Sequence, residues 1–142
     1  MCKVFIDSNI WIYALVDSGV EKEKRVAIIN FLEMLRDDDI FVSTQVINEF
    51  HWILKRKYRI EDDIIKMNVE NGILKLVQVL PQRLTDYKRA YKIRNSFKIS
   101  FWDSLIIASA LENGCNILYT EDMQHNQLIE NKLKIINPFK KI

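Results

Sequence analysis

The chain has 142 residues, a length that suits one domain over residues 1–142. Its formal net charge of +2 neither requires nor excludes a nucleic-acid partner. Its composition, 49% hydrophobic and 28% charged, is ordinary for a globular protein, and two cysteines are too few for a disulfide scaffold and form no zinc-ligand pattern. The N-terminus has no signal-peptide pattern, and the longest early apolar run, Ile10 to Val16, is too short to span a bilayer. We therefore expect a cytoplasmic protein that does not enter the membrane.

Short apolar strands alternate with helices in the first half of the chain. Residues 3–7 are apolar and β-branched, which is typical of a buried strand, and Ser8 or Asn9 can cap the short helix that follows. The expected elements are a strand at 3–7, a short helix at 10–14, a helix at 21–36, a strand at 40–42, and a helix capped by Ser43 or Thr44 that runs to about residue 57.

The second half continues this alternation. The expected elements are a helix from 61 toward 72, a strand at 74–80, a helix capped by Thr85 that runs through 95, a helix at 101–113, and strands at 116–120 and 134–136. Ser100 is the predicted N-cap of the apolar helix at 101–113, and Gly114 occupies the position of a helix-ending glycine. The alternation predicts an α/β fold with a central parallel sheet covered by helices on both faces.

Four acidic residues occupy positions where a charge is costly. Asp7 ends the first buried strand and Asp122 directly follows a later one, so both belong at the carboxyl edge of the sheet, where open α/β sheets bind ligands. Glu49 lies on the apolar face of its helix, and Asp103 lies in the first turn of the most apolar helix. We expect the four carboxylates to face one crevice.

Each acid also has a purely structural explanation. Asp7 can cap the following helix, and Glu49 can pair with a nearby Lys or Arg. Asp103 can complete a capping box with Ser100, and Asp122 can be an ordinary turn residue. The four together favour one site, because buried like charges repel and raise each other's pKa unless a cation joins them.

The chemistry of such a site follows from its donors. No Lys or Arg falls within two residues of any of the four acids, so a divalent cation is the natural compensator. All-oxygen ligands favour Mg²⁺ or Mn²⁺, and His51 and His125 have no ligand-spaced partner that would favour zinc. A cation held by carboxylates activates water for phosphodiester hydrolysis. Asn9 and Thr120 lie beside the acids and could position the attacking water or a ligand.

At these residues the sequence resembles the PIN-domain ribonuclease family. The matching segments are Val4 to Asn9, Ser43 to Glu49, Ser100 to Ala108 and Ile117 to Met123. They occur in the family's order, and the resemblance extends over essentially the whole chain to Phe139. No single motif is specific to the family, but the ordered set is.

The resemblance implies a fold, an activity and partners. The fold is a three-layer α/β/α sandwich with a central parallel sheet, and the activity is Mg²⁺- or Mn²⁺-dependent cleavage of RNA. The family's acidic quartet falls on Asp7, Glu49, Asp103 and Asp122, with its hydroxyl on Thr120. Single-domain members of this size are often VapC-like toxins of type II toxin–antitoxin pairs, which implies a cognate antitoxin.

Further features bear on assembly and on RNA binding. The family habit, together with the large side chains Trp11, Trp52 and Trp102, predicts a homodimer. Asn126 stands where similar proteins often have glycine, and asparagine tolerates a left-handed backbone. Two basic stretches could hold the phosphates of an RNA, or could be solvated faces. The first consists of Lys55, Arg56, Lys57 and Arg59. The second consists of Lys88, Arg89, Lys92 and Arg94, with Tyr87, Tyr91 and Phe97 interleaved.

Other functions remain alternatives. A receiver domain would need a lysine after a late strand, and a phosphatase of the haloacid type would need Asp-x-Asp where this chain has Asp7-Ser-Asn9. A PIN-type RNA-processing nuclease with no antitoxin would carry the same acids. A catalytically inactive RNA-binding module is disfavoured because the acidic quartet is complete.

Overall fold

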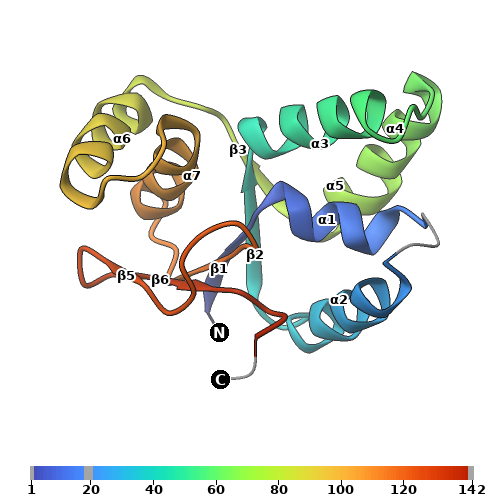
Figure 1. Cartoon of the computed structure of the whole chain (residues 1–142), viewed down its shortest axis with the longest axis horizontal. Coiled ribbons are helices and arrows are strands. Elements are labelled where there is room, and N and C mark those ends of the chain that lie inside the picture. Colours follow the sequence, from blue (N-terminus) through green and yellow to red (C-terminus); the bar gives the residue numbers. More distant parts are fainter. Residues whose placement is uncertain (1, 18–20, 141–142) are drawn as a thin grey trace.

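A six-stranded sheet forms the middle layer of the structure, a computed structural model that describes residues 2–17 and 21–140 (Figure 1). The strands are β1 (Lys3–Ile6), β2 (Asp39–Ser43), β3 (Gln78–Leu80), β4 (Ile117–Tyr119), β5 (Leu128–Ile129) and β6 (Leu133–Ile136). Their spatial order is β3-β2-β1-β4-β6-β5. All neighbours pair in parallel except β5 and β6, so the predicted parallel sheet is confirmed and carries an unpredicted antiparallel edge strand, β5.

Helices cover both faces of the sheet, as the three-layer prediction requires. They are α1 (Ser8–Leu15), α2 (Lys22–Met34), α3 (Thr44–Arg56), α4 (Asp62–Asn68), the π-helical η1 (Val69–Ile73), α5 (Leu74–Leu76), α6 (Leu84–Phe97) and α7 (Phe101–Glu112). Figure 1 shows α1 to α5 on one side of the sheet and α6 and α7 on the other. Right-handed crossovers explain this division, because the chain runs outward from β1 to β3 and then returns to the far side of β1 at β4.

The predicted N-cap of α1 is wrong, whereas that of α7 is confirmed. Ser8 and Asn9 do not cap α1; the N-cap is Asp7, whose carboxylate accepts a hydrogen bond from the backbone N–H of Ser8 at 2.7 Å. The predicted cap of α7 is confirmed, because the Ser100 hydroxyl accepts from the backbone of the first turn. Gly114 follows that helix with a left-handed φ of 73°, as predicted for a helix-ending glycine.

The start of α6 differs from the prediction. Thr85 is not its cap, because the N-cap is Arg83. The Asp86 carboxylate accepts from the backbone N–H of Arg83 at 3.0 Å and moves the helix start toward the N-terminus. Ser43 is the N-cap residue of α3, as one of the two predicted candidates, although its side chain makes no capping hydrogen bond.

The third strand is shorter than predicted. Residues 74–76 are helical, and only residues 78–80 pair with β2. Leu76 is exposed, so the apolar alternation over 74–80 does not mark a buried strand face. Period-two patterning predicts a strand only where a neighbouring strand is available to pair with it.

The core lies between the sheet and both helical layers. It includes β1, the α1 side chain of Trp11 and nearly all of α7, whose residues 104–111 are buried. No helix in the described ranges, 2–17 and 21–140, has the length and apolar character needed to cross a membrane.

The strand order reverses beside β1. From β1 the chain builds outward through β2 and β3, and it then places β4 on the other side of β1. In open α/β sheets, the carboxyl ends of the strands at such a reversal border a ligand crevice. The residues that emerge there are Asp7, directly after β1, and Thr120, directly after β4.

Candidate active site

Asp7 lies at the point where β1 and β4 end. Its backbone N–H donates to the carbonyl of Tyr119, which continues the pairing of β1 with β4 by one residue. Its side chain is only 5% exposed and accepts from the Thr120 hydroxyl at 2.8 Å and from the backbone N–H of Ser8. A buried carboxylate is thus held at the reversal point by groups from both strand ends.

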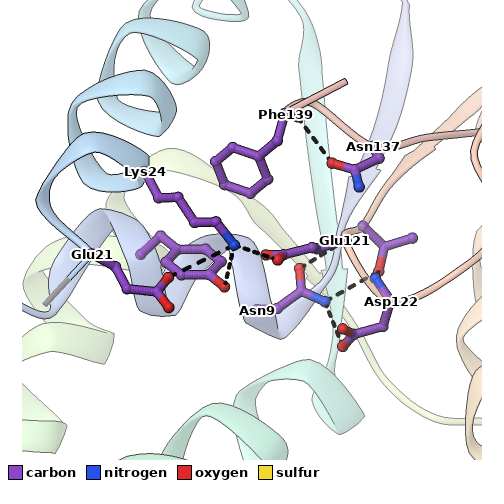
Figure 2. Close-up of polar contacts among 9 residues, drawn as sticks. Asn9, Glu21, Lys24, Glu121, Asp122, Asn137 and Phe139 are labelled. Atoms are coloured by element: carbon purple, nitrogen blue, oxygen red, sulfur yellow. Dashed lines mark hydrogen bonds and ion pairs between the residues drawn. The ribbon is translucent and has the colours of Figure 1, made fainter. Parts of the chain in front are cut away.

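The loop after β4 connects Asp122 to the same network. The amide Nδ2 of Asn9 donates to the Asp122 carboxylate at 2.9 Å and to the Thr120 hydroxyl at 3.2 Å (Figure 2). The backbone N–H of Asp122 also donates to the Thr120 hydroxyl, at 3.2 Å. The Thr120 hydroxyl therefore links Asp7 to Asp122.

Glu49 reaches the cluster from α3. Its carboxylate accepts from the Ser8 hydroxyl at 3.1 Å, and that hydroxyl lies 3.4 Å from Asp7 Oδ1. Its other oxygen accepts from Gln45 Nε2 at 2.7 Å, one helical turn earlier. The same amide nitrogen donates to the carbonyl of Trp102 at 3.2 Å, which connects α3 to the start of α7.

Asp103 completes the group from the first turn of α7. Burial raises the pKa of its carboxyl, the hydrogen bond from Ser100 offsets part of that rise, and the charge of Asp122 adds to it. The backbone N–H of Asp103 donates to the Ser100 hydroxyl, so the residue occupies the capping turn as well as the acidic group. Asp103 can therefore be a residue of the capping turn and a member of the candidate acid cluster at the same time.

The raised pKa values of Asp7 and Asp103 reflect burial first and the charges of neighbouring acids second. Burial raises the pKa of Asp7 from 3.8 to about 7, the Thr120 hydrogen bond opposes the rise, and the charges of Glu49 and Asp103 add to it. Burial is the largest cause of this rise, and no neighbouring positive charge in the described structure opposes it. The cluster is thus short of positive charge.

The donor chemistry fits a hydrated divalent cation. Within the described part of the chain, no group of three or more His, Cys, Asp or Glu side chains is already arranged to hold a metal ion. Mg²⁺ does not need such a cage, because it keeps several waters and commonly binds proteins through one or two carboxylates. The carboxylate oxygens of Asp7, Glu49 and Asp122 at this edge match that requirement, and a bound cation would oppose the burial and like charges that raise the pKa of Asp7.

A lysine close to the site was not foreseen from the sequence. Lys24 Nζ pairs with the Glu121 carboxylate (Figure 2), at a distance of 2.6 Å. It also donates to the Tyr13 hydroxyl. This ion pair directs the Glu121 carboxylate toward Lys24 rather than toward the acid cluster. No local signal could reveal it, because 97 positions separate the two partners.

Other residues singled out in the sequence have mainly structural partners. His51 lies 3.5 Å from Asp62, and the His125 ring nitrogen accepts from the backbone of Asn137, which agrees with their being incidental to the site. Asn126 has a φ of 68°, as its left-handed tolerance predicts. In the basic stretches, Lys55 pairs with Asp62 at 3.1 Å, and Arg89 is held by two glutamates.

The fold and the site define a class: an open α/β sheet with acidic residues gathered where its strand order reverses. The model of the PIN-domain family matches residues 4–130, and the chain therefore belongs to the PIN-domain family. No curated protein sequence matches it significantly.

Solved structures share the fold at low sequence identity. VapC20 of Mycobacterium tuberculosis, described as a toxin that cleaves the sarcin–ricin loop, is 18% identical over 84% of this chain and 89% of its own, with a TM-score of 0.65. VapBC2 from Rickettsia felis, bound to a promoter DNA fragment, is 18% identical over 95% and 99%, with a TM-score of 0.67. A toxin–antitoxin complex from Klebsiella pneumoniae is 18% identical over 97% and 99%, with a TM-score of 0.67.

Proposed function

We propose that this protein is a Mg²⁺- or Mn²⁺-dependent endoribonuclease and the toxin component of a type II toxin–antitoxin pair. The observation that supports the proposal is the hydrogen-bonded linkage of Asp7, Glu49 and Asp122 at the reversal point of the sheet, with the charge of Asp103 near enough to raise the pKa of Asp7. Membership of the PIN-domain family supports nuclease chemistry. The neighbouring structures described as toxins or toxin–antitoxin complexes support the toxin role.

The four acids would hold the cation, which supplies an activated water and neutralises charge on the phosphate. Ser8 holds Asp7 and Glu49 near each other with one hydroxyl, and the buried Thr120 hydroxyl fixes the orientation of Asp7. Asn9 directs its amide hydrogens to Thr120 and Asp122. Asn9 and Thr120 would thus position the attacking water through the carboxylates that they orient.

A circular RNA substrate provides the sharpest test, because only an endonuclease converts a circle to a linear product. We expect linearisation with Mg²⁺ or Mn²⁺, none with EDTA, and none from Asp7→Asn protein purified in parallel. Undiminished cleavage in excess chelator, or by the Asp7→Asn protein, would contradict the proposal by pointing to a contaminating or metal-independent nuclease.

The same proposal includes two protein partners: a cognate antitoxin and a second copy of this chain. Exposed large apolar side chains on two helical regions support protein contacts: Val26, Ile29 and Met34 on α2, and Ile64, Met67, Leu74 and Leu76 on α4 to α5. Light scattering of the purified protein at micromolar concentration tests the homodimer, and a monomer alone would refute it. Co-expression with the protein encoded by an adjacent short reading frame tests the antitoxin.

A further inference from the structure

A groove of about 720 Å³ lies directly beside the acid cluster. Its walls come from α3, α6 and α7, and they include Trp52, Tyr87 and Trp102. Trp52 is 60% exposed and Trp102 is 65% exposed, whereas Trp11 is completely buried in the core. Two exposed indoles in one groove are unusual, because residues of this size are highly buried on average.

The groove is continuous with the acids. Glu49 lines it and also accepts from the Ser8 hydroxyl within the cluster. Gln45 donates from one nitrogen to Glu49 and to the carbonyl of Trp102. Both partners are acceptors, so the orientation of this amide is determined and the groove wall is joined to the acid cluster through hydrogen bonds. Trp102 also directly precedes Asp103.

The lining chemistry suits a neutral planar ring rather than a phosphate. Glu49 is the only charged residue among those that line the groove, and its charge repels phosphate. The remaining lining is aromatic, aliphatic, hydroxyl or amide, including the exposed amide of Asn48. The guanidinium of Arg56 lies over the Trp52 ring, 4.8 Å from its centre, so it covers one face of this indole and leaves the other face for a planar ligand.

We propose that this groove is a base-stacking subsite, in which Trp52 and Trp102 bind an unpaired nucleobase of an RNA whose adjoining phosphate lies at the acid cluster. The inference rests on the proposed ribonuclease function and names its substrate class: single-stranded or looped RNA. Aromatic stacking tolerates any base, so the subsite selects for unpaired structure more than for sequence.

The test uses the full chain and an uncleavable probe, a short 2′-O-methyl oligoribonucleotide, so that binding is measured apart from cleavage. We expect the single strand to quench tryptophan fluorescence, and a duplex or an abasic strand of the same length to quench it far less. Trp52→Ala and Trp102→Ala should each weaken binding by about tenfold, and Phe at either position should restore most of it. Leu128→Ala is the matched control, because Leu128 is 50% exposed on β5, outside the groove, and its loss should leave binding unchanged.

Several outcomes would overturn the subsite. One is unchanged binding by both alanine variants, with thermal melts showing that they are folded. Another is equal binding of the duplex and the abasic strand. If the alanine variants kept RNA binding but lost the complex with a co-expressed antitoxin, the groove would be a protein interface instead. If the protein cleaved RNA equally well without either tryptophan, the subsite alone would be overturned. If RNA binding depended on the tryptophans but no metal-dependent cleavage occurred, the subsite would be supported and the nuclease function overturned.

Discussion

Two grooves of nearly equal size differ in what their walls can do. The groove beside the acid cluster, about 720 Å³, has exposed indoles and a single charge, whereas the groove along α6, about 730 Å³, is lined by several charged residues, including Lys88 and Lys92. From the sequence, the basic and aromatic residues of α6 could hold phosphates and stack bases, or could form a solvated face.

The structure weakens that interpretation of the α6 groove. Arg89 lies 3.4 Å from Glu112 and 3.4 Å from Glu130, so two carboxylates balance its charge. None of the four candidate acids lines this groove. The presence of a candidate acid in the wall therefore distinguishes the two grooves better than their volumes or their basic residues do.

The largest expected effect comes from matched Glu→Gln changes in the two walls. Glu49→Gln removes a carboxylate from the acid cluster and should lower the cleavage rate by about 100-fold or more, the usual cost of losing a group that stabilises transition-state charge. Glu112→Gln makes the same chemical change in the α6 groove and should leave the rate within about twofold. Rates on one RNA substrate at saturating Mg²⁺ measure both. Equal losses in the two variants would erase the distinction between the grooves.

The next effect is a pH-dependent stability difference at Asp7. Its pKa of about 7 in the folded state exceeds its ordinary 3.8, so between these values the native protein holds a proton that the unfolded chain has released. The free energy of unfolding contributed by this group therefore falls as pH rises from about 4 to above 7. Asn cannot ionise, so the stability of Asp7→Asn relative to wild type should rise over that range by on the order of a few kcal/mol.

Urea melts in EDTA at several pH values measure this difference. Asp62→Asn is a control of opposite sign, because Lys55 lowers the pKa of Asp62 at the exposed surface. That variant should lose relative stability only as pH rises toward the ordinary Asp pKa of 3.8, and it should show no further change over the range in which Asp7→Asn gains. A flat pH dependence for Asp7→Asn would mean that Asp7 is not strained in the folded protein.

A smaller effect is expected at Asp103. Burial and the nearby charge of Asp122 raise the pKa of this carboxyl, so Asp103→Asn should leave the metal-free protein as stable as wild type or more stable, while abolishing cleavage. The backbone bond to Ser100 does not depend on the side chain and is retained. Added Mg²⁺ should raise the melting temperature of wild type more than that of the variant, because only binding to the native state stabilises it. A loss of about 1 kcal/mol or more in EDTA would show that the residue is chiefly a structural cap.

The smallest effect concerns the α6 groove itself. Combined Lys88→Ala and Lys92→Ala changes should weaken binding of single-stranded RNA by less than about threefold, mainly at low salt, because exposed charges act through a screened field. Fluorescence titrations at two salt concentrations measure this. A loss larger than that of Trp102→Ala would reverse the ranking of the grooves and place the main RNA contacts on α6.

Local patterning was sufficient for most of the fold. Apolar runs with period two or near 3.6 predicted five of the six strands and the principal helices, because those periods follow from backbone geometry alone. The two strands that were predicted wrongly or missed, β3 and β5, depend on pairing with a strand from another part of the chain. The strand predicted at 74–80 shrinks to the three residues that β2 can pair, and the short β5 forms only because β6 lies antiparallel beside it.

For the site, the sequence by itself predicted Asp7, Glu49, Asp103 and Asp122, because an acid at a strand end or on an apolar helix face conflicts with its local environment. The tertiary structure alone decided how they are connected. Ser8 became a bridge between two acids, and Gln45 a link between α3 and α7. Lys24 came to pair with Glu121 across 97 positions. Such contacts depend on the crossing of distant elements at the reversal of the sheet, and no periodicity within a single segment encodes that crossing.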